Sequence, residues 1–135
     1  MAVGNKFNQF IADVYNGVHN LSSDTIKAYL TNVAPIATNS VKADIAEIAA
    51  GNGYTAGGVT IAVTSSTQTA GTYSLVTGDA TITATGAIGP FRYVVFYNGT
   101  TVNNRVIQWY DYGSAVTMAS GDTFTIDTTT LRSAT

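Results

Sequence analysis

The spacing of apolar residues predicts a helix near the start of the chain. These residues recur at steps of three and four positions, the spacing that places side chains on one face of a helix. They are Phe7, Phe10, Ile11, Val14 and Val18. We therefore expect a helix over about residues 5–16, with Gly17 at its end because glycine favours helix termini.

The next segment has the pattern of a strand, and the one after it has the pattern of a helix. Residues 24–32 show the two-residue period of a half-buried strand, with Ile26, Ala28 and Leu30 on one side. Residues 41–50 return to helical spacing, and Ser40 is suited to cap a short helix there. The glycine-rich residues 51–58 end that helix.

From Gly58 onward the pattern is typical of strands and turns. Residues 59–68, 72–86 and 122–128 alternate β-branched with small polar side chains. Residues 91–97 differ because both faces are apolar, which indicates a central strand. Alternation places Phe91, Tyr93, Val95 and Tyr97 on one face, and Val94 and Phe96 on the other.

These elements predict a mainly β fold, a β-dominated α+β class. Segment 105–112 follows the central strand after a polar loop and is expected to be its antiparallel neighbour. The expected architecture is an antiparallel β-sandwich with one or two short N-terminal helices, forming a single domain over residues 1–135. The alternation is lost at about 129–135, which predicts a flexible tail or an arm ordered only by a partner.

Composition narrows the classes of function. The 135 residues carry a formal net charge of −2, and the six lysines and arginines are scattered, so we expect no nucleic-acid partner. No stretch approaches the roughly 20 apolar residues of a membrane span, and no secretory signal is evident, so we expect no membrane association and synthesis in the cytoplasm. Cysteine is absent, which excludes disulfides and thiolate chemistry.

The candidate catalytic and metal-binding residues favour structural roles. His19 is the only histidine, no Gly-x-Ser-x-Gly motif accompanies it, and we expect it at the surface or a helix end. Asp44 and Glu47 lie three residues apart, as on a solvated helix face. The remaining acidic candidates sit in predicted turns and are Asp79, Asp122 and Asp127. We therefore expect no enzymatic activity, no cofactor and no metal site.

Three aromatic residues form the candidate partner interface. Trp109, Tyr110 and Tyr112 follow one another along a predicted strand. Alternation requires that Trp109 or Tyr110 points away from the main core. An outward aromatic side chain beside Tyr112 suits contact with a partner protein or a sugar, and simple core packing of these residues is the alternative interpretation.

Three segments carry a resemblance to a known family. Residues 41–58, 74–98 and 107–126, which include "EIAAGNGYTAGG", "IGPFRYVVFYN" and "WYDYG", resemble small virion proteins of tailed bacteriophages and prophages. The resemblance implies a structural component of the virion without enzymatic activity.

Within that family we expect a capsid decoration, or cement, protein. Its partners would be the major capsid protein or other virion proteins, and further copies of itself in a homo-oligomer. A tail or head-fibre component and a carbohydrate-binding module are the alternatives.

Overall fold

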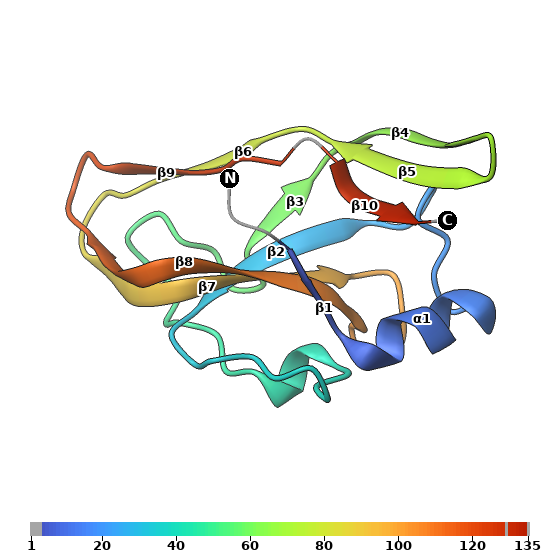
Figure 1. The fold of residues 1–135 in the computed structure, drawn as a ribbon. Helices are drawn as coiled ribbons and strands as arrows, with labels where there is room; N and C mark the ends of the chain where they lie inside the picture. The colour runs from blue at the N-terminus through green and yellow to red at the C-terminus, as the bar shows by residue number, and fades with distance from the viewer. Residues whose placement is uncertain (1–3, 129, 135) are drawn as a thin grey trace.

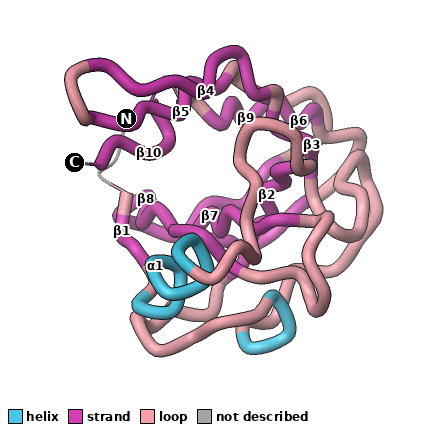
Figure 2. Tube along the Cα trace, turned by 90° about the vertical axis from the view of Figure 1, so that its right-hand side faces the viewer, coloured by secondary structure: helices cyan, strands magenta, loops and turns pink. Residues whose placement is uncertain are grey.

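The computed structural model describes residues 4–128 and 130–134 and consists of two strand layers, with a short helix and irregular segments beneath them (Figures 1 and 2). The main sheet has five strands. In spatial order they are β1 (Asn5–Lys6), β8 (Val106–Met118), β7 (Ile88–Asn98), β2 (Ile26–Thr31) and β3 (Val59–Ile61). All of its pairings are antiparallel.

The second layer contains two smaller antiparallel sheets. One has the order β10 (Thr130–Ala134), β5 (Thr72–Thr77) and β4 (Val63–Thr69), and the other pairs β6 (Ala80–Thr83) with β9 (Thr123–Ile126). Figure 2 shows these strands facing the main sheet as the second half of a sandwich. The predicted mainly β, antiparallel fold is confirmed.

Strand β7 is central in the main sheet, as the apolar pattern predicted. It lies between β8 and β2, and side chains on both of its faces are buried. Val94 and Phe96 belong to the large core between the two strand layers, whereas Val95 and Tyr97 belong to a smaller core on the opposite face.

The predicted position of Phe91 is wrong. Its side chain lies in the large core with Val94, on the face opposite Val95. The alternation of β7 is broken here, because Phe91 and Val94 lie three residues apart and face the same core. The pairing with β8 shifts register at the same point, since Phe91 pairs with Val116 whereas Tyr93 pairs with Asp111, which leaves extra residues in β8 as a bulge.

The first predicted helix is present, but shorter than expected. Helix α1 spans Asn8–Tyr15, and Asn5–Lys6 instead form strand β1 against β8. Gly17 follows the end of the helix with a φ of +75°, a conformation that glycine adopts without strain.

The second predicted helix, over residues 41–50, is wrong apart from one 3-10 turn at Lys42–Asp44. Residues of strand β2 form hydrogen bonds with backbone groups that would bond to one another in a longer helix. Tyr29 Oη donates to the carbonyl of Ile45 at 3.0 Å, and the Ile48 amide donates to the carbonyl of Leu30 at 3.1 Å. These contacts hold the segment across the second face of the main sheet, where Ile45 is buried.

The shortest of the stretches that join the two strand layers runs from β3 to β4. β3 pairs with β2 in the main sheet, and after Ala62 the chain continues as β4, which pairs with β5 in the second layer. Gly58 precedes this stretch with a φ of +81°, and a Cβ there would lie 1.8 Å from the carbonyl oxygen of Ala28. Only glycine allows this close approach of two backbones.

The C-terminal residues differ from the expected flexible tail at 129–135. Thr130–Ala134 form strand β10, which pairs with β5, and Leu131 is buried in the large core. Thr129 and Thr135 lie outside the described residues. A single apolar side chain at Leu131 was too weak a signal to predict a strand.

Replacement of Phe96 with alanine tests the central position of β7. Phe96 is fully buried, so Phe96→Ala should lower the free energy of unfolding by roughly 3–5 kcal/mol. Denaturant unfolding measures the change, with Val102→Ala as the control because Val102 is 81% exposed. The control should change the free energy by less than about 0.5 kcal/mol. Equal stability of the two variants would contradict the position of β7.

Candidate functional site

The three candidate aromatic residues of β8 lie on two faces of the main sheet. Trp109 is on the face of the smaller core, where its ring packs against Phe7 with a centroid distance of 4.6 Å. Tyr110 is on the opposite face, buried in the large core against Phe96. Alternation along β8 therefore separates Trp109 from Tyr110, as predicted, and both are packing residues.

Tyr112 is the exposed member of the three. Its side chain lies on the same side as Tyr110, and 57% of the residue is exposed. Its ring meets the ring of Phe124 edge to face, with centroids 5.5 Å apart. The ring of Phe124 in turn packs against the ring of Phe91, with centroids 4.9 Å apart. Tyr112 is therefore the outer end of a row of three aromatic rings that starts in the core.

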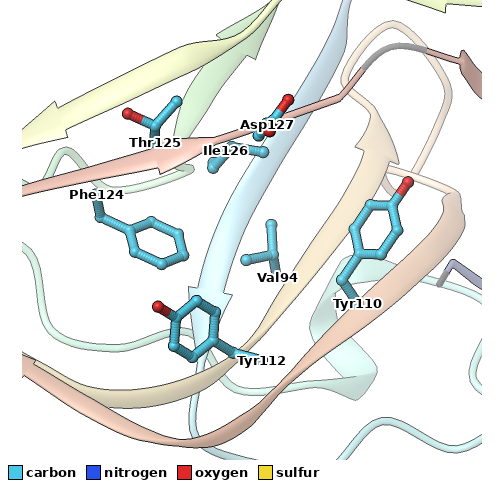
Figure 3. Close-up of a pocket in the computed structure, with 7 residues that line it drawn as sticks. All are labelled: Val94, Tyr110, Tyr112, Phe124, Thr125, Ile126 and Asp127. Carbon is cyan, nitrogen blue, oxygen red and sulfur yellow. The ribbon is translucent and has the colours of Figure 1, made fainter. Parts of the chain in front are cut away.

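A pocket of about 210 Å³ lies beside Tyr112, between β8 and β9. Figure 3 shows Tyr110 and Tyr112 on one side, the β9 residues on the other and Val94 between them. The β9 side comprises Phe124, Thr125, Ile126 and the following Asp127. The sequence did not connect β9 with Tyr112, because the contact joins strands that do not pair with each other.

An ion pair fixes the backbone next to Tyr112. Arg92 on β7 donates from Nε to Asp111 Oδ1 at 2.8 Å and from Nη2 to Oδ2 at 3.1 Å. The Gly113 amide also donates to Asp111 Oδ1, at 2.8 Å. The hydrogen bonds from Arg92 are the main cause that lowers the pKa of Asp111 below its ordinary value, and the bond from the Gly113 amide acts in the same direction. They hold the β8 bulge on both sides of Tyr112.

His19 is buried, which corrects its expected position at the surface or a helix end. Its Nδ1 lies 3.0 Å from Asn98 Nδ2, which also donates to Asp24 Oδ2 at 2.7 Å. Nδ1 is therefore the acceptor, and Nε2 carries the proton of the neutral ring. Nε2 faces Asp13 Oδ2 at 4.0 Å, and Arg105 Nε lies 3.7 Å from the same oxygen. This cluster joins α1 to the loops at the ends of β7 and β8.

Asp44 and Glu47, the other candidate pair, serve separate structural roles. Asp44 Oδ2 accepts hydrogen bonds from the amides of Ser40 and Val41, which lower its pKa. Glu47 accepts from Lys42 Nζ at 2.9 Å and from Tyr54 Oη at 2.5 Å. Neither carboxylate lies on the solvated helix face that we expected.

The acidic residues in turns behave mainly as predicted. Asp79 accepts a hydrogen bond from the amide of Thr128, and Asp122 accepts one from the amide of Ala119. Asp127 instead lines the pocket beside Tyr112. Among residues 4–128 and 130–134, no group of three or more His, Cys, Asp and Glu side chains is placed to hold a metal ion.

Comparisons with models of known protein families, with curated proteins and with solved structures give no match for this chain. Within the part of the chain that the structure describes, no helix has the length and apolar character needed to cross a membrane. The site must therefore be interpreted from its own geometry.

The buried His19 predicts a loss of stability in mild acid. Burial lowers the pKa of His19 from its ordinary value of about 6.5, although Asp13 and Asp24 act in the opposite direction. Below about pH 6.5 the unfolded chain therefore binds a proton that the folded protein does not. The free energy of unfolding should fall by at most about 1.4 kcal/mol per pH unit from this group.

Denaturant unfolding between about pH 7.5 and 5.5 measures this effect. His19→Gln removes the titrating group but keeps an oxygen that can accept from Asn98, so its stability should depend less on pH over this range. The same dependence of stability on pH in both proteins would show that the pKa of His19 does not differ between the folded and unfolded states.

Proposed function

We propose that this chain is a structural protein of a tailed-phage virion, namely a capsid decoration or cement protein that binds neighbouring major capsid subunits. The proposal rests on the resemblance of residues 41–58, 74–98 and 107–126 to small virion proteins. The observation that carries a binding role is the exposed aromatic pocket at Tyr112. In contrast, His19 and Glu47 are engaged in contacts that hold the fold.

The dimensions of the pocket favour contact with a protein. Its volume of about 210 Å³ is below the roughly 300–1,000 Å³ typical of small-molecule sites. Its lining is aromatic and aliphatic except for Thr125 and Asp127. A single apolar side chain of a capsid subunit suits a pocket of this kind, because buried aromatic contacts supply much of the binding energy of protein interfaces.

The low charge of the chain suits a role in a repeated shell. With a net charge of −2, long-range attraction contributes little, and short-range packing and hydrogen bonding must provide the affinity. Equivalent capsid sites present the same surface to every copy of the protein. Each copy can therefore bind weakly, because many copies together stabilise the shell.

One feature of the pocket favours a carbohydrate-binding module as a second candidate. The lining of the pocket includes Thr125 and Asp127 as well as Tyr112, and hydroxyl and carboxylate groups are suitable partners for sugar hydroxyl groups. The isolated protein would then bind glycans without any capsid, and Tyr112→Ala would abolish that binding. A glycan array separates this candidate from a cement protein.

Replacement of Tyr112 tests the proposed contact. Tyr112→Ala should weaken binding to capsids that lack the protein by about tenfold, since loss of an interface aromatic costs more than about 1 kcal/mol. Co-sedimentation with purified capsids measures the affinity. Tyr15→Ala is the matched control, because Tyr15 is 85% exposed on α1. Equal affinities for both variants would place the capsid contact elsewhere.

The number of copies per virion distinguishes a cement protein from a tail component. A cement protein should saturate at a ratio set by the icosahedral lattice, because every equivalent site presents the same surface. Particles without it should assemble but rupture more readily on heating, and added protein should restore resistance. A mass ratio to the major capsid protein far below the lattice value would favour a tail or head-fibre component.

A further inference from the structure

Strand β4 is an outer strand with an unusually neutral edge. It is an edge strand of the β10-β5-β4 sheet and forms a hairpin with β5, which Figure 1 shows at the border of the upper layer. Its seven residues, Val63–Thr69, include neither a charged residue nor proline. No Asp, Glu, Lys or Arg occurs in the sequence between Glu47 and Asp79.

The other outer strands carry features that oppose edge-to-edge pairing. In the sequence, charged residues occur in or next to most of them: Lys6 in β1, Arg132 in β10, Asp79 next to β6, and Asp122 and Asp127 on either side of β9. Strand β3 is only three residues long. Charge and short length are common ways in which monomeric proteins prevent an exposed edge from pairing with another chain. Among the outer strands described, β4 is the longest without a charge.

The hairpin geometry identifies the backbone groups that β4 presents. A two-residue turn at Ala70 and Gly71, both with positive φ, joins Thr69 to Thr72. In such a hairpin the residues that flank the turn bond to each other, and the bonded pairs then alternate along the strands. The amide and carbonyl groups of Ser66 and Gln68 therefore point away from β5. The bulge in β4 is confined to its start, between Val63 and Ser65.

We propose that two copies of this chain associate through antiparallel pairing of their β4 strands. The contact joins two three-stranded sheets into one continuous sheet. A twofold axis near Ser66, the middle residue of β4, pairs the largest number of backbone groups. Such an axis brings the residues next to Ser66 close to their own copies, so a charge at these positions would repel itself. The neutral side chains of β4 meet this requirement.

This self-association goes beyond the proposed capsid role and does not depend on it. The β4 edge and the Tyr112 pocket involve different strands, β4 in one case and β8 with β9 in the other. A dimer formed through β4 leaves Tyr112 available for a capsid subunit. The two proposals can therefore fail separately.

The experiment compares the full chain with two lysine variants by analytical ultracentrifugation over a range of concentrations. Thr67 is exposed on β4, and with the axis near Ser66 its Cβ lies about 7 Å from that of its copy. Thr67→Lys should therefore raise the dissociation constant of the dimer about tenfold or more. Thr83→Lys is the matched control, because Thr83 is an exposed threonine on β6, and it should leave the constant unchanged.

Amide hydrogen exchange of the unmodified protein provides a second measurement if Thr67→Lys does not fold. Protection of the Ser66 and Gln68 amides should rise with protein concentration. A monomer at every concentration, a dimer insensitive to Thr67→Lys, or protection independent of concentration would overturn the proposal. Protection that appears only on capsid binding would also overturn it, and would identify the capsid as the occupant of the edge. Co-sedimentation of Tyr112→Ala with capsids tests the cement role independently.

Discussion

Backbone pairing of β7 with both β8 and β2 is the constraint on which the rest of the structure depends. A strand in this position has two faces to bury, and its apolar side chains alternate between them. The second strand layer covers the face with Phe96. The segment after β2 and helix α1 lie beyond the other face, where Val95 and Tyr97 are buried (Figure 2). The three layers of the fold follow from this one strand.

The covering segment has little regular structure, so specific polar contacts hold it in place. Glu47 accepts hydrogen bonds from Lys42, from Tyr54 and from the amide of Gly57. Tyr54 Oη also accepts from the amide of Leu30 in the main sheet, and burial raises its pKa above the ordinary value. Glu47 thus ties three parts of this segment together, and Tyr54 links them to the sheet, which is why the carboxylate of Glu47 is a structural group.

The sequence predicted those features that depend on local pattern, and it missed those that depend on contacts between distant segments. The apolar faces of residues 91–97 identified the central strand, because two-sided burial leaves a clear local signal. The helix over 41–50 failed because bonds to β2 outweighed a weak helical preference. In the candidate site, alternation correctly separated Trp109 from Tyr110. The pocket itself needed the contact of Tyr112 with Phe124, which neither residue reveals in the sequence.

The continuous chain from β3 through Ala62 to β4 gives the sandwich a mechanical property. Because β3 is bonded to β2 and β4 is bonded to β5, a force applied to β4 passes along covalent bonds into the main sheet. It does not need to pass through the softer side-chain contacts between the layers. Tension at the outer edge is therefore shared by two sheets, and it acts on rows of backbone hydrogen bonds that resist sliding together.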